Sequence, residues 1–466
     1  MITMKQRIPR IVIAATQSGS GKTTIVTGLL AALKEKGLKV QSYKVGPDYI
    51  DPGYHEIASG RPGHNLDTWL VTEERLAEIF AKTADDADIA IIEGVMGLYD
   101  GGRNGISSTA SVAKLLDAPV LLVINAKSMG ESAAALALGF KQYDPTVNIA
   151  GVILNRLGSP THCQMIEEAL EKLDIPVYGA VSRNDKMNMP ERHLGLVPVQ
   201  ENNSEAEVVA EIGRTVGSSV DIEAIIRLAN EAPELEVPER YALPTERKVR
   251  IAVARDDAFT FYYPESIYQL EMAGAEIIPF SPLSDNALPE ADGLILGGGF
   301  PEMFATRLYT NETMRDSISR AADSGMPIYA ECGGFMYLMR EMVDFDGNHF
   351  PMTDIVPGYV EMNKKLQTVG YVEATMEMDT VLGEKGTVLH GHEFHFSSEC
   401  VPNNTDPKEY PRAFTFQRMR DIPPYMAGYA KGNILGSYLH LHFAGCPDAA
   451  KYFVEKCMAY RCKQEK

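Results

Sequence analysis

The stretch T-Q-S-G-S-G-K-T-T, residues 16–24, decides the fold of the N-terminal half of the chain. It follows the short apolar run R-I-V-I-A-A-T (10–16), and the segment from Lys22 to Lys36 after it has helical periodicity. A strand, a glycine-rich turn and a helix in this order predict a phosphate-binding loop, whose backbone amides surround phosphate oxygens. The loop departs from the strict G-x-x-x-x-G-K-[ST] pattern at its first position, where Thr16 replaces glycine.

This loop is expected to hold the phosphates of ATP together with Mg²⁺. The lysine of such a loop reaches the outer phosphates, and the hydroxyl after it can ligate the metal. The predicted nucleotide-binding residues are Gly19, Ser20, Gly21, Lys22, Thr23 and Thr24. Thr23 also belongs to the predicted metal site, with two carboxylates: Glu93, at the end of A-D-I-A-I-I-E (87–93), and Asp48, in K-V-G-P-D-Y-I-D-P (44–52). For Asp48, a solvated loop carboxylate is the alternative interpretation.

Apolar runs and helical segments alternate through the first half, which predicts a parallel sheet covered on both faces. Further strands are expected at 39–45, 87–93, 119–125, 149–155 and 176–181, and helices near 107–116, 130–142 and 162–173. Residues 231–248, rich in proline and charge, are interpreted as a linker between a synthetase domain (1–230) and a second α/β domain (249–466). In the second domain, strands are expected at 249–255, 291–299, 326–334 and 433–443, before a helix near 447–460.

Composition narrows the class of protein. A chain of 466 residues is too long to fold around one ordinary hydrophobic core, so two or more domains are expected. A composition of 45% hydrophobic and 23% charged residues is typical of a globular protein. A net charge of -19 argues against nucleic acid as a partner. No apolar run is long enough for a signal peptide or a membrane span, and the six cysteines include no C-x-x-C pair. We therefore expect a cytoplasmic enzyme without disulfides.

The stretch Y-A-E-C-G-G-F (329–335) places Cys332 between a strand and a helix, on a sharp turn. One interpretation is a small buried hydrophobe, and the other is a nucleophile on an elbow. L-G-G-G-F-P-E (296–302) ends another strand, and the amides of Gly298 and Gly299 could form an oxyanion hole. Y-L-H-L-H-F (438–443) places two histidines at alternate positions, so that one of them could be the base for the cysteine.

These three motifs resemble the class I glutamine amidotransferase domain of the cobyrinic acid synthase branch. The resemblance implies that Cys332 attacks the side-chain amide of glutamine, forms a γ-glutamyl thioester and releases ammonia. Matching the G-[ST]-Y-x-H pattern assigns the base to His440. Two positions depart from the pattern: Ala330 stands where related glutaminases often have glycine, and His442 where they commonly have glutamate. We therefore predict a Cys332–His440 dyad rather than a triad and leave the role of His442 open.

The motifs of the first half, with N-L-D-T-W (65–69), E-G-V-M-G-L-Y-D-G (93–101) and P-E-R-H-L-G-L (190–196), resemble the a,c-diamide synthases of cobyrinate and of nickel-sirohydrochlorin. That half is also similar to dethiobiotin synthetase. The resemblance implies amidation of the a and c acetate carboxylates of a tetrapyrrole through an acyl phosphate, at the expense of ATP and glutamine. The product would enter cobalamin biosynthesis or, in methanogenesis, coenzyme F430 biosynthesis. The metal and macrocycle, and the order of the two amidations, stay open.

The expected partners are ATP, L-glutamine and an anionic tetrapyrrole, with no nucleic acid and no membrane. The oligomeric state stays open, with a homodimer as one alternative. His193 is a further candidate near the nucleotide. The residues predicted to bind the tetrapyrrole, on crevice loops, are Lys44, Asp48, Tyr49, Asp100 and Arg103. The competing class is a P-loop regulatory or partitioning ATPase that carries a non-catalytic glutaminase-like domain.

Overall fold

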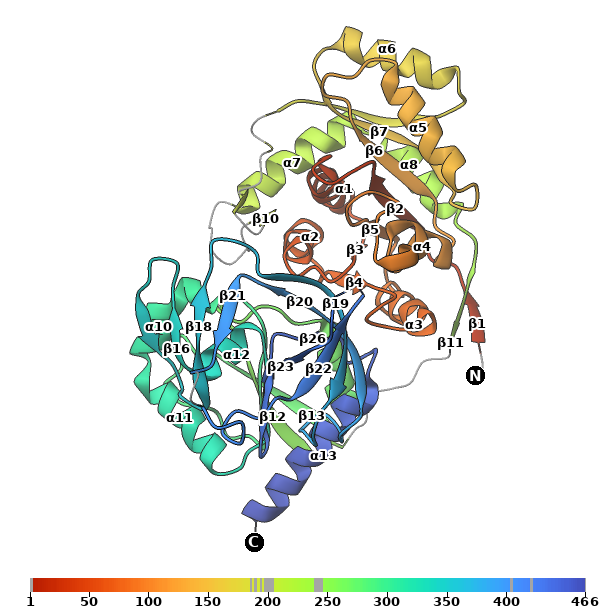
Figure 1. Cartoon of the computed structure of the whole chain (residues 1–466). Coiled ribbons are helices and arrows are strands. Elements are labelled where there is room, and N and C mark those ends of the chain that lie inside the picture. The colour runs from red at the N-terminus through yellow and green to blue at the C-terminus, as the bar shows by residue number, and fades with distance from the viewer. Residues whose placement is uncertain are drawn as a thin grey trace. The chain divides into compact units, whose positions relative to one another are not determined.

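The chain forms two compact units, each built from helices and strands (Figure 1). The computed structural model describes residues 3–184, 187, 191–192, 195–196, 205–238, 246–402, 405–419 and 422–465. The first unit comprises Met1–Thr68 and Thr72–Arg240, and the second comprises Trp69–Val71 and Tyr241–Lys466. Within the described ranges, every helix is too short or too polar to cross a membrane.

The first unit is built on a seven-stranded sheet in which every pairing is parallel. The strand order β4-β3-β5-β2-β6-β7-β8 places β2, which leads into the phosphate loop, at the centre. All the strands predicted for this half are present. The strands are β2 (Arg10–Ala15), β3 (Val40–Val45), β4 (His64–Leu66), β5 (Ile89–Glu93), β6 (Val120–Asn125), β7 (Ile149–Leu157) and β8 (Val177–Ser182).

Helices bury both faces of this sheet, as the continuous apolar strands predict. Ile11 and Ile13 of β2 belong to a core shared with helices α1, α2, α7 and α8, whereas Val12 and Ala14 are equally buried on the other face. The helices of this unit are α1 (Lys22–Glu35), α2 (Asp51–Ser59), α3 (Glu73–Thr83), the 3-10 turn η1 (Arg103–Gly105), α4 (Thr109–Leu115), α5 (Ser132–Tyr143), α6 (Pro160–Glu171), α7 (Glu205–Ser219) and α8 (Ile222–Asn230).

Two short antiparallel pairs complete the first unit. Strand β1 (Thr3–Gln6) pairs with β11 (Leu235–Pro238), so part of the predicted linker 231–248 is a strand of this unit instead. Strand β9 (Glu191–Arg192) pairs with β10 (Gly195–Leu196). The candidate His193 and residues 239–245 of the predicted linker lie outside the described residues.

The second unit has a six-stranded central sheet of order β13-β12-β14-β15-β25-β24, parallel except at the β24 edge. Its strands are β12 (Val249–Ala254), β13 (Ala275–Phe280), β14 (Gly293–Leu296), β15 (Ile328–Glu331), β24 (Tyr429–Lys431) and β25 (Ile434–Ser437). The helices of this unit are α9 (Pro264–Met272), the 3-10 turn η4 (Pro301–Phe304), α10 (Ala305–Thr310), α11 (Glu312–Asp323), α12 (Gly333–Leu338) and α13 (Pro447–Gln464).

Two further sheets of the second unit were not predicted. One has the order β17-β16-β18-β21 and the other the order β23-β22-β19-β20-β26. Their strands are β16 (Met339–Val343), β17 (His349–Pro351), β18 (Val356–Met362), β19 (Thr368–Met376), β20 (Val388–His395), β21 (Ser397–Cys400), β22 (Phe414–Arg418), β23 (Tyr425–Ala427) and β26 (His440–Leu441).

The single strand predicted at 433–443 is therefore wrong. Residues 434–437 form β25 beside β15, and residues 440–441 form β26, which pairs with β20 in a different sheet. The chain changes sheet just after Ser437, whose Oγ accepts a hydrogen bond from the backbone N–H of Leu439. Such a side-chain bond replaces ladder pairing and ends a strand. The change of sheet brings His440 to the end of β15, where the nucleophile lies.

Candidate active site

The phosphate loop joins β2 to α1, and two glycines make its turn possible. Gly19 (φ +74°) and Gly21 (φ +85°) are left-handed, a conformation that favours glycine. A Cβ at Gly21 would lie 2.3 Å from Nδ2 of Asn155. That Nδ2 donates to the carbonyl of Ser20 at 2.9 Å, so the end of β7 holds the loop. Sequence reasoning missed Asn155, although a polar residue closing the apolar run 149–155 was a usable signal.

The lysine and threonines of the loop lie at the start of α1. Lys22 is buried, and its Nζ donates to the carbonyl of Met96 at 2.7 Å. Burial and the nearby charge of Lys44 lower the pKa of Lys22 to about 8, against the opposing pull of neighbouring carboxylates. Thr24 is half-buried in the first turn of the helix. The ammonium of Lys22, the group expected to bind a phosphate, is therefore largely shielded from water.

A buried cluster of charged side chains surrounds the hydroxyl of Thr23. Its Oγ1 lies 2.7 Å from Oε1 of Glu93 and 3.2 Å from Oδ2 of Asp51. Nζ of Lys44 donates to the same two oxygens, at 2.8 Å and 2.5 Å. Nε2 of His55 lies 2.7 Å from the second oxygen of Glu93. Two carboxylates, an ammonium and an imidazole thus converge on one threonine hydroxyl.

The two carboxylates of this cluster have opposite protonation preferences. Burial favours neutral Glu93, but Lys44 and His55 outweigh burial and lower the pKa of Glu93. Burial and the negative charge of Asp48 raise the pKa of Asp51, against the pull of Lys44. A cation placed between them would favour the ionised form of both.

The donors of this cluster suit a hard cation such as Mg²⁺, which prefers carboxylate, hydroxyl and phosphate oxygens. Thr23, Asp51 and Glu93 offer those oxygens within one small region. In the part of the chain that the structure describes, no three His, Cys, Asp or Glu side chains are placed to form a metal site by themselves. The oxygens of this cluster could hold a metal together with the phosphates of a nucleotide.

Asp48, predicted as a metal ligand, has a different position. Its Oδ1 accepts the backbone N–H groups of Ile50 at 2.8 Å and of Asp51 at 3.1 Å, at the start of α2. Its other oxygen lies 3.8 Å from Nζ of Lys44. The aspartate beside Thr23 is Asp51, three residues further along the same motif. The two aspartates could not be separated by motif spacing alone.

Of the residues predicted to bind the tetrapyrrole, Lys44 lies within strand β3, and the others lie on the segments after β3 and β5, in different environments. Lys44 is buried and faces carboxylates rather than an open surface. Asp100 is exposed, and its Oδ2 accepts the N–H of Gly97 at 2.9 Å. Arg103 is exposed at the start of η1, and Tyr49 is half-buried. Of the two cations predicted to bind the substrate, Lys44 and Arg103, Arg103 is therefore the one that an anionic substrate could reach.

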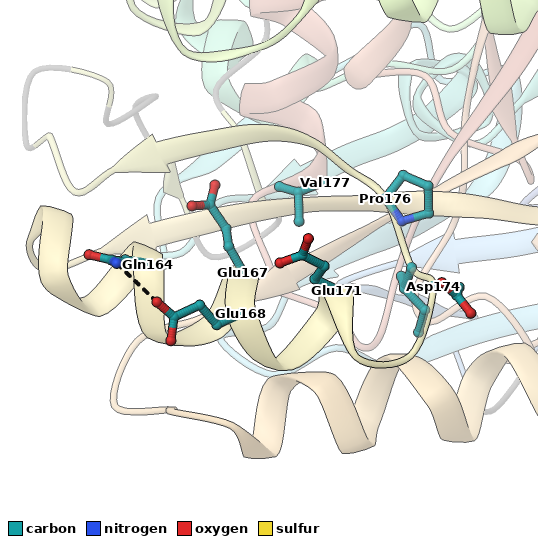
Figure 2. A pocket seen from close by; sticks show the side chains of 8 residues that line it. Gln164, Glu167, Glu168, Glu171, Asp174, Pro176 and Val177 are labelled. Atoms are coloured by element: carbon teal, nitrogen blue, oxygen red, sulfur yellow. Dashed lines mark hydrogen bonds between the residues drawn. The ribbon is translucent and has the colours of Figure 1, made fainter.

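A separate cavity of about 600 Å³ lies along α6 and the start of β8 (Figure 2). Its lining includes four carboxylates, and the amide of Gln164 donates to Glu168 at 2.9 Å. The cavity lies at the amino end of β8, whereas the phosphate loop follows the carboxyl end of β2 in the same parallel sheet. Its negative lining is unsuited to phosphates, and we assign it no ligand.

In the second unit, Cys332 occupies the elbow between β15 and α12. Its backbone has φ +45° and ψ -103°, a conformation that is costly for any residue other than glycine. The N–H of Cys332 donates to the carbonyl of Ser437 at 2.8 Å, which ties the elbow to β25. A Cβ at Gly334 would lie 2.1 Å from the carbonyl oxygen of Leu296, so only glycine fits there. This conformation is typical of a nucleophile elbow rather than of a small core residue.

His440 is the base that the structure places beside this thiol. Its imidazole interacts electrostatically with the side chain of Cys332, and its Nδ1 lies 3.5 Å from Oε2 of Glu331. Burial alone would lower the pKa of His440, but Cys332 and Glu331 outweigh burial and raise it to about 10. An imidazolium is thus favoured next to the sulfur, which activates a cysteine nucleophile.

The two glycines predicted for the oxyanion hole lie beside this pair. A Cβ at Gly298 would come within 2.6 Å of the His440 ring, and a Cβ at Gly333 would lie 3.1 Å from the backbone nitrogen of Gly299. His442 has other neighbours: it stacks on Tyr263, with ring centroids 4.6 Å apart. The structure thus brings together Cys332, His440 and both glycines.

Comparison with known protein families gives the class of this protein. Residues 11–197 match the CobQ/CobB/MinD/ParA nucleotide binding domain, and residues 250–447 match the CobB/CobQ-like glutamine amidotransferase domain. A phosphate loop with its carboxylate cluster in one unit and a cysteine–histidine pair in the other define an amidotransferase ligase with a P-loop nucleotide-binding domain.

Individual relatives narrow the class to a family. The chain is 46% identical to the cobyrinate a,c-diamide synthase of Dehalococcoides mccartyi, over 96% of this chain and 97% of that protein. It is 40% identical to the cobyrinate a,c-diamide synthase of Leptospira interrogans (98% and 100% covered) and 43% identical to the hydrogenobyrinate a,c-diamide synthase of Streptomyces coelicolor (97% and 98% covered). The chain belongs to the cobyrinate a,c-diamide synthase family, which confirms the predicted resemblance.

Proposed function

We propose that this enzyme converts the a and c acetate side chains of a cobyrinate-type tetrapyrrole into amides, with ATP and glutamine as co-substrates, in cobalamin biosynthesis. The observation that carries the proposal is that one chain holds both a Cys332–His440 pair on an elbow and a phosphate loop with a buried carboxylate cluster. Near-full-length similarity to relatives named for a,c-diamidation of cobyrinate or hydrogenobyrinate supports the choice of substrate.

The first unit would activate the carboxylate. A carboxylate does not exchange oxygen for nitrogen at neutral pH, because oxide is not a leaving group. In the proposed step, a carboxylate oxygen attacks the γ-phosphorus of ATP, and the bond to the β-phosphate oxygen breaks, giving an acyl phosphate and ADP. Lys22 and the amides of the loop would hold the phosphates in line and offset the charge that develops on them.

Thr23, Asp51 and Glu93 would hold Mg²⁺ together with the nucleotide phosphates. When bound, the ion supplies positive charge to the phosphate oxygens. Lys44 and His55 would keep Glu93 ionised and oriented toward that site. Arg103 and Tyr49 are the proposed contacts to the tetrapyrrole.

The second unit would supply ammonia. The Cys332 thiolate attacks the side-chain amide carbon of glutamine, and the amides of Gly298 and Gly299 are the proposed donors to its oxygen. His440 donates its proton to the leaving nitrogen, which departs as ammonia, and water then hydrolyses the thioester to glutamate. Ammonia attacks the acyl phosphate, and inorganic phosphate leaves as the amide forms. The glutaminase step releases nitrogen as free ammonia, which is nucleophilic, whereas ammonium taken from solution at neutral pH is not.

Mass-resolved product analysis tests the proposal. Purified protein with ATP, Mg²⁺ and glutamine is offered cobyrinate, hydrogenobyrinate and nickel-sirohydrochlorin in separate reactions. We expect two successive replacements of OH by NH₂ on a cobyrinate-type substrate. Turnover of nickel-sirohydrochlorin would extend the function to the F430 branch. ATP consumption with no mass change on any substrate would contradict the proposal and favour the regulatory ATPase.

Nucleotide affinity is expected to fall as the pH rises above about 8, because Lys22 must carry a proton to bind phosphate and its pKa is lowered to about 8. Below that pH the lysine is already charged, and above it each further pH unit costs up to about tenfold in affinity. Calorimetric titration with a non-hydrolysable ATP analogue from pH 7 to 9.5 measures the effect.

Lys22→Arg separates this cause from others, since a guanidinium stays protonated throughout that range. Its affinity, even if weaker at pH 7, should lose the dependence on pH. Lys36→Ala, on an exposed side chain at the end of α1, should keep the wild-type profile. A wild-type affinity that stays flat to pH 9.5 would contradict the assignment.

A further inference from the structure

The glutaminase site contains a carboxylate that the sequence motif does not account for. At the position commonly occupied by glutamate in such domains stands His442, which faces the carboxylate of Glu265 at 3.8 Å. His440 faces a different carboxylate, since its Nδ1 lies 3.5 Å from Oε2 of Glu331. Glu331 is the residue immediately before Cys332 and is 8% exposed.

The carboxylate of Glu331 is fixed by groups on two strands. Its Oε1 accepts the hydroxyl of Tyr329, on the same strand β15, and the backbone N–H of Leu441, at 3.3 Å, on β26. Burial and the charge of Glu331 hold the pKa of Tyr329 well above its usual range, so the hydroxyl keeps its proton and donates. With Oε1 occupied, Oε2 faces the imidazole.

Among the described residues, titratable groups from several elements lie against the His440 ring. They include the thiol of Cys332, the carboxylate of Glu331 and the imidazole of His392, which stacks on His440 with ring centroids 4.9 Å apart. Burial, then the proximity of His440 and of His442, keep the pKa of His392 well below its usual range, so His392 stays neutral. Glu331 therefore brings the fixed negative charge to the histidine.

We propose that Glu331 is the positioning residue of the glutaminase site, taking the place of the missing glutamate at position 442. The proposal rests on the proposed use of glutamine by this unit. The thiol proton moves to Nε2 of His440, while Nδ1–H stays directed at Oε2 of Glu331. The carboxylate selects this tautomer and stabilises the imidazolium, which later gives its proton to the departing nitrogen.

The test compares Glu331→Gln with Glu265→Gln, a matched change of another buried carboxylate that faces a buried histidine. Glu331→Gln should lower kcat for glutamine about 10- to 100-fold with little change in KM, because it removes a group that acts through the base. Ammonia-dependent amidation should stay at the wild-type rate, because the phosphate site lies in the other unit. Thermal unfolding of both variants should match wild type and report that the second unit is folded. Glu265→Gln should keep its glutamine-dependent activity.

Alkylation of Cys332 by iodoacetamide, followed on its peptide by mass spectrometry, gives a readout that does not depend on the substrate assignment. A less stable imidazolium leaves less thiolate at neutral pH. Glu331→Gln should therefore be alkylated about tenfold more slowly than wild type at pH 7 and recover at higher pH. Glu331→Asp, which keeps the charge, should lie closer to wild type, and Glu265→Gln should match wild type.

Each contrary result bears on one proposal. Wild-type kcat and alkylation in Glu331→Gln, or equal losses in Glu265→Gln, would overturn the positioning role. Alkylation as slow in Glu331→Asp as in Glu331→Gln would also overturn it. If wild-type protein does not use glutamine at all, the proposed function fails, yet the alkylation profiles still decide whether Glu331 sets the state of the cysteine–histidine pair.

Discussion

Replacing Cys332 by serine is expected to abolish glutamine-dependent amidation, by about 1,000-fold or more, while ammonia-dependent amidation stays close to the wild-type rate. A serine hydroxyl has a far higher pKa than a thiol, so the imidazole of His440 removes its proton much less readily. Serine is similar in size and should fit the same elbow. Because the phosphate site lies in the other unit, the acyl phosphate should still form and react with added ammonia.

The measurement is amide formation with 15N-labelled glutamine or with labelled ammonium at pH 8 to 9, where more of the ammonia is unprotonated. Cys400→Ser, on the half-buried Cys400 of β21, is the matched control and should behave as wild type. Loss of activity with both nitrogen sources would mean that the two units do not divide the chemistry as proposed. Undiminished glutamine use would place the nucleophile elsewhere, and ATP turnover without any amide product would favour the regulatory ATPase.

Much of the fold was predictable because local sequence determines it. Parallel strands buried on both faces appear as continuous apolar runs, and the strands predicted in the first unit are all present. The elbow was equally visible, since a cysteine followed by two glycines after an apolar run leaves few other conformations. Residues 339–431 were not predictable in the same way. Most of their strand pairs are antiparallel, and some join strands far apart in the sequence, as β19 and β22 do. Buried and less buried side chains alternate along strands such as β18, instead of forming one continuous apolar run.

The two sites show the same division between local and long-range information. The phosphate loop and Cys332 each lie within one short motif, and the sequence identified them. The aspartate that lies beside Glu93 and Thr23 could not be identified that way, because Asp48 and Asp51 belong to the same motif. Only the structure shows that Asp51 contacts Thr23, whereas Asp48 accepts a backbone N–H at the start of α2. Glu331 was overlooked for a related reason. Its role depends on β26 leaving the central sheet, which the strand predicted at 433–443 did not allow.

Replacing Glu93 by glutamine is expected to remove amidation with either nitrogen source, by about 1,000-fold or more. The carboxylate touches the hydroxyl of Thr23, the ammonium of Lys44 and the imidazole of His55, so its charge organises the whole cluster. Neutral glutamine would leave Lys44 with one carboxylate fewer and would weaken the proposed metal site. Without activation of the carboxylate, ammonia from any source has no electrophile to attack.

Breaking a buried ion pair also costs about 3–5 kcal/mol of stability, so thermal unfolding must accompany the assay. Lys22→Ala provides a second variant, because the Lys22 ammonium donates to a backbone carbonyl and its loss should disturb the fold less. Both variants should still hydrolyse glutamine, since Cys332 lies in the other unit. Glu78→Gln, in a partly exposed pair with Arg75, should keep all activities. Ammonia-dependent amidation at the wild-type rate in both Glu93→Gln and Lys22→Ala would contradict the phosphate site as the place where the carboxylate is activated.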